Sequence, residues 1–578
     1  MAGSTAASVL QRLPVDGSQG EPQGVAATAG AAASVAPGEA HVAPVAAATA
    51  ARADAATWAP LRDPLFRDLW IASVASNVGT WVQSVAAVWL MTSLSPSPAM
   101  TALVQTAASL PLVIFALPAG ALADMMDRRR LLLASQWWML LASGALGFAT
   151  LHGWVDPWVL LGLTFALGVG SAFTAPAWQA ITLELVPTSQ LPAAVALGSA
   201  SINGARAIGP GLGGVLVAAV GPAFAFLANA ASFVGVIAVL FRWQRRVVAS
   251  ELPREQVFGA IRAGLRYVRH SPALHRIYVR VGLFVVASSA LLALLPVLAR
   301  RDMHQDAAGY GLLLASLGVG AVGGAAALPR LRAALGTDRL VDASGIGLAI
   351  VLAALSFVPP FWAATLALFF AGVAWTVPLS SLNVATQTVV PGWVRARALA
   401  FHLLVLQGGL ALGAAAWGWI ADRTGTPEAL AFAAATLVVA TAVGLRVRLK
   451  HTDHLDLSPA ARALPKEVAE AAGYEDGPVL VTIEYRIDPA RGDEFAQAME
   501  VVRRMRRRGG AWRWGLFADT AEPGAYVESF LVESWLDHLR QHERMTVLDR
   551  DISARARAFH VGDGDPIVRH LIARLPIG

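Results

Sequence analysis

The sequence GALADMMDRRR, residues 120–130, ends an apolar stretch that begins at residue 99. Its first residue, Gly120, removes a side chain where two helices can approach closely. Asp124 can pair with Arg128 one turn along a helix, or face the positive N-terminal end of another helix. The alternative is a basic turn that orients the chain in a membrane and carries one incidental carboxylate. In both interpretations the segment marks the end of a membrane span.

Apolar stretches of similar length recur on both sides of this segment. A helix needs about 20 largely apolar residues to cross a bilayer. Twelve stretches approach or exceed that length, at residues 68–94, 99–123, 130–151, 157–180, 192–220, 222–242, 275–299, 309–329, 339–358, 361–385, 394–420 and 427–446. The chain of 578 residues is 56% hydrophobic and only 15% charged, whereas soluble domains carry about a quarter charged residues. The sequence therefore predicts a multi-pass membrane protein with twelve spans.

Basic residues concentrate in alternate connections between these spans. One set of connections holds the six arginines of residues 254–280, together with Arg128, Arg129, Arg130, Arg242, Arg245, Arg246, Arg330, Arg332, Arg339, Arg395, Arg397, Arg446, Arg448 and Lys450. The other set holds Arg300, Arg301 and Arg423. Because basic connections stay in the cytoplasm, we expect an inner-membrane protein with both termini cytoplasmic. The net charge of +6 is then a topology signal, and no nucleic-acid partner is expected.

Composition also divides the chain into segments. We expect a disordered tail at residues 1–57, because it is rich in Ala, Gly, Pro and Ser and has no helical period. The remaining segments are a first six-helix half at 58–242, a linker at 243–274, a second six-helix half at 275–450, a polar linker at 451–477 and a cytoplasmic domain at 478–578. The chain contains no cysteine, which excludes disulfides, thiolate catalysis and cysteine-ligated metals.

The linker at 243–274 contains an amphipathic pattern. Phe258, Ile261, Leu265 and Val268 fall on one helical face, and Arg262, Arg266 and Arg269 fall on another. A helix of this kind can lie on an anionic leaflet. The alternative is a polar linker helix without lipid contact.

Glycine, proline and arginine positions indicate an internal repeat. An offset of 204 residues aligns Gly120 with Gly324, Arg128 with Arg332, Gly168 with Gly372, Pro187 with Pro391, Gly209 with Gly413, and Gly214 with Gly418. Each pair falls at the same place in its own half. This favours two similar halves that rock about a central cavity.

The fifth apolar stretch contains a second motif, NGARAIGPGLGG at residues 203–214. Arg206 lies within the span, where an ionisable group is costly and needs partners or water. The motif also contains Asn203, Gly209, Pro210, Gly213 and Gly214. Its glycines let a neighbouring backbone approach, and its proline permits a bend. Tight packing alone is an alternative explanation for the glycines.

These motifs resemble those of the major facilitator superfamily. The segment at 120–130 and the Gly209-Pro210 element are similar to its cytoplasmic-loop motif and its fifth-span motif. Four stretches resemble the transmembrane secretion effector branch, which is related to enterobactin exporters: residues 76–81, 120–130, 176–180 and 203–210. The resemblance covers about residues 62–450 continuously, and we expect it to include the C-terminal tail.

The resemblance implies a cytoplasmic latch. Asp124 and Arg128 would close it against the start of the eleventh span near Trp393–Arg397, with Asp127, Arg129 and Arg130 completing the motif. In the second half Leu328 stands where an aspartate is expected, so only the first half keeps the latch.

A substrate cavity between the halves should be lined by polar or aromatic residues of the spans. We take the candidates to be Asn77, Trp81, Gln83, Gln105, Gln136, Trp137, Asn229, Asn383, Gln387, His402 and Gln407. Each can instead be an interhelical hydrogen bond or an interface aromatic. Such a cavity is polar yet nearly uncharged apart from Arg206, which suits an amphipathic or anionic organic substrate.

Coupling residues are scarce. A proton carrier needs an intramembrane carboxylate or histidine, and Glu184, Asp342 and His402 are the candidates. No Walker motif is found, so an internal ATPase is not expected. Proton antiport follows from the resemblance.

The last hundred residues read as a separate α+β unit. Strands are expected at 479–487, 512–518, 525–534 and 567–573, and helices at 489–508 and about 535–557. The order βαββαβ indicates a ferredoxin-like sandwich. The stretch ESWLDHLRQH, residues 533–542, resembles antibiotic-biosynthesis-monooxygenase proteins. An enzyme interpretation would use Trp535, His538 or His542 around a hydrophobic substrate or haem. A dimerising or regulatory module is the alternative we favour, because no metal-ligand spacing or nucleophile–base pair accompanies them.

The sequence thus predicts an all-α polytopic membrane protein with a small C-terminal α+β domain. We expect a proton-coupled exporter of a siderophore, secondary metabolite or drug, acting by alternating access. We expect no enzyme activity, cofactor or metal, and homodimerisation through the C-terminal domain stays open. The alternative is a membrane-anchored sensor or enzyme that acts through residues 478–578.

Overall fold

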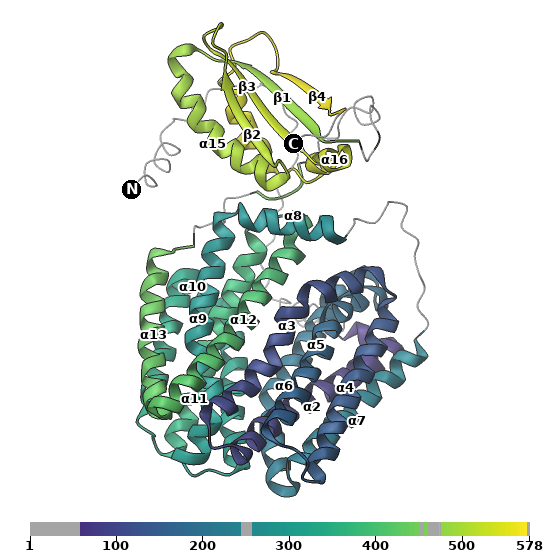
Figure 1. Ribbon diagram of the computed structural model, residues 1–578, viewed down its shortest axis with the longest axis vertical. Coiled ribbons are helices and arrows are strands. Elements are labelled where there is room, and N and C mark those ends of the chain that lie inside the picture. Colours follow the sequence, from purple (N-terminus) through teal and green to yellow (C-terminus); the bar gives the residue numbers. More distant parts are fainter. Residues whose placement is uncertain (1–57, 244–256, 450–455, 461–472, 474–475, 575–578) are drawn as a thin grey trace, which may run out of the picture.

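The computed structural model describes residues 58–243, 257–449, 456–460, 473 and 476–574. The expected N-terminal tail, residues 1–57, lies outside the described residues. A large helical bundle carries a smaller α+β unit at one end (Figure 1). We call the end of the bundle that carries this unit the terminal face, and the opposite end the far face.

The first half of the bundle contains six long helices. They are α2 (Pro64–Leu94), α3 (Pro98–Met125), α4 (Arg128–Leu151), α5 (Pro157–Leu185), α6 (Leu191–Val220) and α7 (Pro222–Arg242). Side chains immediately before four of them accept hydrogen bonds from the first-turn backbone; these are Asp63, Ser97, Asp127 and Asp156. Most also have proline in the first turn, where its missing N–H costs nothing. Local sequence therefore fixes where these helices begin.

The second half follows a short helix, α8 (Val257–Arg269), on the terminal face. It contains α9 (Pro272–Val297), the short π-helical turn η5 (Leu298–Asp302), α10 (Ala307–Ser356), α11 (Phe361–Thr388), α12 (Gly392–Thr424) and α13 (Thr426–Arg446). Two predicted spans, 309–329 and 339–358, fall on α10, and the second extends two residues past its end. Its interior contains Gly336 with φ of 73°, a left-handed conformation that bends the chain between them.

Not every long helix has the composition of a membrane span. Among the described residues, nine helices are long and apolar enough to cross a membrane, with α10 counted once. Helices α2 and α6, of 31 and 30 residues, are outside that set. The protein is a multi-pass membrane protein, and the number of twelve spans stays a prediction.

The C-terminal unit follows the predicted βαββαβ order. Its strands are β1 (Val479–Arg486), β2 (Arg513–Ala518), β3 (Ala525–Val532) and β4 (Ile567–Ile572), and its helices are α15 (Gly492–Gly509), α16 (Trp535–Glu543) and α17 (Val547–Arg557). The sheet is antiparallel in the order β2-β3-β1-β4. Strand β1 alternates buried and partly exposed residues, so its buried side chains contact the helices on one face of the sheet.

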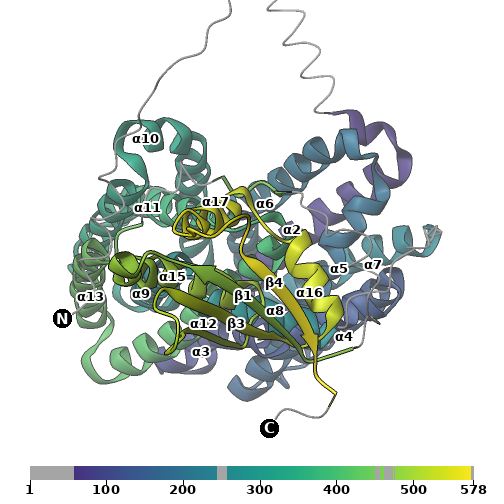
Figure 2. The ribbon, with the colours of Figure 1, turned by 90° about the horizontal axis from the view of Figure 1, so that it is seen from above.

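The C-terminal unit contacts the bundle through α8. Arg262 of α8 lies 3.0 Å from Glu533, and Arg266 lies 3.9 Å from the same carboxylate. The view along the vertical axis places the sheet over α8, α9 and α12 (Figure 2). Arg262 and Arg266 therefore pair with a carboxylate of the protein. This contact favours the interpretation of α8 as a polar linker helix over a helix that faces lipid headgroups.

Candidate functional site

The two halves contact each other closely where α6 crosses α10. A Cβ atom on Gly214 would lie 2.6 Å from the carbonyl oxygen of Ala307 and 2.7 Å from the Cα of Gly311. One on Gly318 would lie 2.6 Å from the carbonyl oxygen of Arg206. Such distances leave no room for a side chain, so glycine at these positions allows the two helix backbones to touch.

The second contact between the halves has the same construction. A Cβ atom on Gly418 of α12 would lie 2.9 Å from the Cα of Ala99 on α3. Gly214 and Gly418 are one of the pairs aligned by the 204-residue offset, and each packs against a helix of the other half. The internal repeat is thus visible in the interface, where α6–α10 and α3–α12 are equivalent crossings.

The repeat also extends to contacts within each half. Gly209 on α6 packs against Trp81 of α2, and its counterpart Gly413 on α12 packs against Val286 of α9. Each contact joins the fifth helix of a half to the first. This equivalence supports an internal repeat in which the two halves have the same helix arrangement.

Polar contacts join the halves near the far face. The Ser97 hydroxyl donates a hydrogen bond to Asp422 at 2.7 Å. Arg300 donates to the Thr92 hydroxyl at 2.9 Å. The ring of Trp89 stacks on that of Tyr310, with centroids 5.8 Å apart. These contacts close the bundle at the end away from the C-terminal unit.

Arg206 lies in the α6–α10 contact, opposite Gly318 of α10. Its guanidinium carbon is 5.9 Å from the Trp81 ring centroid, a cation–π contact with α2. Asn77, one turn earlier on α2, donates to the Ser201 hydroxyl of α6 at 3.0 Å. The structure thus brings together Arg206, Trp81 and Asn77, three predicted site residues from two apolar stretches. Asn203, in the same motif, is exposed.

The gate motif at 120–130 has a mixed outcome. A Cβ atom on Gly120 would meet nothing in the described part of the chain within 4 Å, so the expected close approach of two helices at this glycine is wrong. The structure describes the backbone of Asp124 but not its side chain, so its pairing stays a prediction. Asp127 accepts from the backbone N–H of Arg130 at 3.0 Å and begins α4. Arg129 donates to the carbonyl oxygens of Leu240 and Phe241 at 2.8 and 2.9 Å. These two residues therefore act within the first half, one as a helix cap and the other by holding α4 to the end of α7.

The expected partner of the latch has neighbours of its own. Trp393, at the start of α12, packs edge-on against Tyr267 of α8, with ring centroids 5.5 Å apart. A Cβ atom on Gly264 of α8 would lie 3.0 Å from the Cβ of Arg397. Helix α8 therefore lies directly against the α12 end that the latch was expected to contact.

Other cavity candidates make hydrogen bonds within one half. Gln105 donates to Ser109, Gln387 donates to Asn383, and His402 pairs with Thr386 at 3.0 Å. Gln83 bonds Ser143 and Asn229 inside the first half. These contacts match the alternative interpretation of interhelical or local hydrogen bonds. Gln136 is buried and its side-chain oxygen has no partner among the described residues. Gln407 is half-buried on α12, and Trp137 is 44% exposed.

One charged cluster was not identified from the sequence. Arg280 was counted among the basic residues of the cytoplasmic connections, but it lies inside α9 and is only 4% exposed. Its guanidinium bonds both Asp338 and Asp342 of α10. Removing a partner from a buried ion pair costs about 3–5 kcal/mol, so the cluster holds α9 to α10. The position of Arg280 could have revealed the cluster. It lies eight residues after Pro272, which begins α9, and is therefore about two turns inside the helix.

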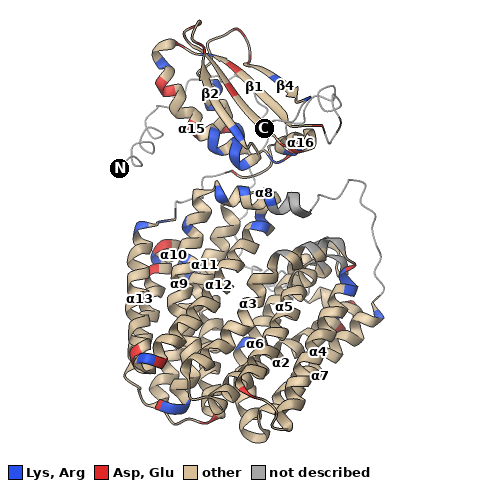
Figure 3. Ribbon diagram, in the orientation of Figure 1, with Lys and Arg blue, Asp and Glu red and all other residues tan. Residues whose placement is uncertain are grey.

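Charge is distributed unevenly over the molecule. Lys and Arg residues gather on the terminal face and the adjoining helix α15, and the middle of the bundle carries few charges (Figure 3). This distribution matches a bundle whose middle lies in hydrocarbon.

Two similar halves, joined by repeat-related glycine contacts, define a secondary transporter of the major facilitator class. The model of the transmembrane secretion effector family matches residues 55–576. The chain therefore belongs to this family, and the match extends through the C-terminal unit.

Relatives and solved structures agree with this class. The multidrug efflux pump Tap of Mycolicibacterium fortuitum is 25% identical over 63% of this chain and 90% of its own length. The enterobactin exporter EntS of Salmonella typhi is 31% identical over 57% of this chain and 78% of its own length. The nucleoside transporter NupG has a similar fold, with a TM-score of 0.53, 12% identity and coverage of 66% of this chain and 98% of that one.

Proposed function

We propose that this protein exports a small amphipathic organic compound, such as a siderophore or a drug, by alternating access. The observation that carries the proposal is the pair of repeat-related contacts, α6–α10 and α3–α12, that join the halves. Two equivalent crossings allow the halves to rock about one axis, opening one face while the other closes. Relatives that include a multidrug efflux pump and enterobactin exporters support efflux as the direction.

The expected orientation places the terminal face in the cytoplasm and the protein in the inner membrane. The uneven distribution of arginine supports this orientation. The contacts near the far face then correspond to closure on the outside. We propose as functional segments the two halves at 58–242 and 275–450 and the C-terminal domain at 478–578, as expected from the sequence.

Protons are the coupling ion that we propose. Asp338 and Asp342 share one guanidinium, that of Arg280. With both carboxylates ionised the cluster has one excess negative charge, so it can take up a proton without leaving a buried positive charge. Asp342→Asn should therefore weaken the dependence of transport on the proton gradient while substrate exchange without a gradient continues.

Asp124 and Arg128 are the latch residues that we propose for the terminal face. Asp124→Asn should leave folding intact and lower turnover about tenfold or more. Asp68→Asn, on an exposed aspartate at the start of α2, is the control. Unchanged transport by Asp124→Asn would contradict the latch.

Export can be tested in bacterial cells that lack their own efflux pumps. Cells expressing the full chain are expected to retain less of a labelled siderophore or amphipathic drug than cells expressing Asp124→Asn. A chain that ends before residue 478 should keep some efflux, because the proposed pathway lies in the bundle. Complete loss of activity in a folded truncated chain would favour the sensor or enzyme alternative.

Homodimerisation is a second proposal and rests on the outer face of the C-terminal sheet. Phe517, Ile567 and Leu571 are 60%, 55% and 50% exposed on this face. The same face also carries the Arg569–Glu484 ion pair, at 2.7 Å. Exposed apolar side chains beside such charges suit contact with a second copy. Light scattering of the purified protein should give twice the chain mass, and Phe517→Glu should reduce it to one. A single-chain mass for the native protein would refute the dimer.

A further inference from the structure

A cavity of about 640 Å³ lies beneath the C-terminal sheet, between this unit and the bundle. We propose that it is a binding site for a small organic acid with an apolar body, separate from the transport pathway. The volume is within the range of small-molecule sites, about 300–1,000 Å³.

Apolar side chains form the inner wall of the cavity. Val481 and Ile483 of β1, Phe530 of β3 and Met505 of α15 all line it. These residues are at most 8% exposed and belong to the core of the C-terminal unit. A ligand in the cavity would contact these apolar core side chains, so its body should be apolar.

His538 provides the polar end of the cavity. It is 2% exposed, and neither ring nitrogen has a well-formed hydrogen bond among the described residues, although Gln541 lies close enough to influence it. Burial, followed by nearby His542 and His570, lowers the pKa of His538 to about 3. The ring is therefore neutral near pH 7, with one nitrogen that can donate and one that can accept. Buried polar groups without partners are rare in proteins, and a ligand oxygen would supply the missing one.

Three histidines at this end do not indicate a metal site. The rings of His542 and His570 lie 4.9 and 4.8 Å from that of His538, measured between centroids. Within the described ranges, however, no group of three or more His, Cys, Asp or Glu residues has metal-binding geometry. The three histidine rings are therefore better suited to an organic ligand than to a metal ion.

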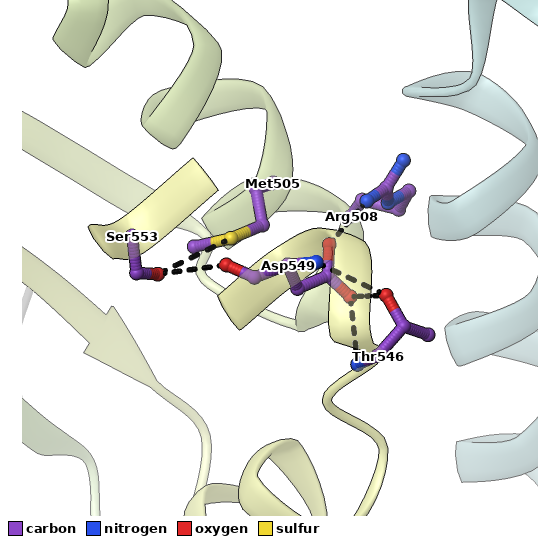
Figure 4. Close-up of polar contacts among 5 residues, drawn as sticks. All are labelled: Met505, Arg508, Thr546, Asp549 and Ser553. Carbon is purple, nitrogen blue, oxygen red and sulfur yellow. Dashed lines mark hydrogen bonds and ion pairs between the residues drawn. The ribbon is translucent and has the colours of Figure 1, made fainter. Parts of the chain in front are cut away.

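Positive charge around the cavity favours an anion. Five arginines and two aspartates line it, and one further carboxylate, Glu528, pairs with Arg506 at 3.0 Å. Arg508 bonds Asp549 at 2.5 Å, which fixes α15 against α17 beside the opening (Figure 4). Arg550 pairs with Asp551, a carboxylate outside the lining, at 3.5 Å. The five arginines and the four carboxylates Asp549, Asp551, Asp565 and Glu528 then leave one excess positive charge. A carboxylate on the ligand would reduce it.

The bundle supplies the remaining wall of the cavity. Tyr267 of α8 and Trp393 of α12 line it, and Arg544 of the C-terminal unit lies over the Trp393 ring, 4.6 Å from its centroid. A bound molecule would therefore contact both the C-terminal unit and the start of α12. Binding should stabilise the docked arrangement of the two parts.

The test uses the full chain in lipid nanodiscs and isothermal titration calorimetry, with 1-naphthoate as the probe. Its neutral amide, 1-naphthamide, is the matched ligand. Val568, which is 49% exposed and lines the cavity, is changed to Trp to fill it. Ile567→Trp is the matched control, because Ile567 is adjacent on β4, is 55% exposed and is on the other face of the sheet.

The proposal predicts one saturable naphthoate site per chain and at least tenfold weaker binding of the amide. Val568→Trp should weaken naphthoate binding at least tenfold, His538→Leu should also weaken it, and Ile567→Trp should leave it unchanged. Absence of saturable binding would overturn the proposal. Equal binding of naphthoate to the native chain and to Val568→Trp would show that the probe binds outside this cavity, and would overturn the proposal. Equal binding of the amide would refute an acid as the ligand. Calorimetry does not depend on export, so failure of this site leaves the proposed transport function unaffected.

Discussion

The hydroxyl of Ser97 donates to both carboxylate oxygens of Asp422, at 2.9 and 2.7 Å. Ser97 precedes α3 in the first half, and Asp422 lies near the end of α12 in the second. The same carboxylate accepts from the backbone N–H of Ala99 at 3.2 Å. One side chain thus joins the two halves at the far face, next to the close packing of Gly418 on α3.

Loss of this carboxylate should favour opening of the far face. Hydrogen bonds to charged groups contribute about 1.5–3 kcal/mol when buried, and less for an exposed residue such as Asp422. We expect Asp422→Ala to raise the open population several-fold. Because the chain has no cysteine, a single cysteine at Ala411, which is 1% exposed, can report it through its rate of maleimide labelling. An unchanged labelling rate would contradict the role of Asp422.

Gly214→Ala should disrupt the α6–α10 crossing. Its methyl group would lie 2.6 Å from the Ala307 carbonyl oxygen, and backbone atoms cannot move away as a flexible side chain can. We expect at least a tenfold loss of transport. Gly211→Ala is the control, because its methyl group would meet only Ala315, at 3.5 Å. Equal transport by the two variants would contradict a tight crossing.

Arg280→Ala should destabilise the second half. The substitution leaves two carboxylates, Asp338 and Asp342, without their shared cation, and we expect a loss of about 3–5 kcal/mol. Thermal unfolding in detergent should show a clearly lower midpoint. Arg276→Ala, one turn earlier on α9 and half-buried, is the matched control. Similar midpoints for the two variants would refute a special role of the cluster.

Acidification should destabilise the C-terminal unit through His538. Its folded pKa of about 3 lies below the ordinary value of 6.5, so between these pH values the unfolded chain binds a proton that the folded chain excludes. Stability is therefore complete above about pH 6.5 and falls as the pH decreases towards 3, by up to about 1.4 kcal/mol per pH unit. Denaturant unfolding, followed with a fluorophore on a cysteine at exposed Arg569, should show this slope. His538→Phe should reduce it, and an identical slope would exclude His538 as its source.

Much of the fold could be predicted because its signals are local. Apolar length located the long helices, and period-two alternation located all four strands of the C-terminal sheet. The 204-residue offset also identified equivalent helix crossings, since Gly214 and Gly418 each pack against the other half. These features depend on residue type at fixed spacing, which a sequence displays directly.

Partners across the fold could not be predicted in the same way. The sequence placed Arg262 and Arg266 on one helical face, but not opposite Glu533, which lies more than 260 residues further along the chain. Arg280 was counted as a topology charge although it falls within the expected span at 275–299, because the sequence does not show its pairing with Asp338 and Asp342 of α10. Asn383 and Gln387 bond each other along α11, and their place in a substrate cavity stays a prediction. The contacts of Arg262, Arg266 and Arg280 join residues far apart in the chain, which spacing alone does not encode.

Flux through purified protein tests the central claim most directly. The full chain would be reconstituted into liposomes with an imposed proton gradient, and a panel of labelled siderophores and amphipathic drugs would be followed. We expect saturable, gradient-dependent movement of at least one compound, with strongly reduced movement by Gly214→Ala and normal movement by Gly211→Ala. If folded protein moved no compound, or if Gly214→Ala matched the native rate, an alternating-access exporter would be contradicted.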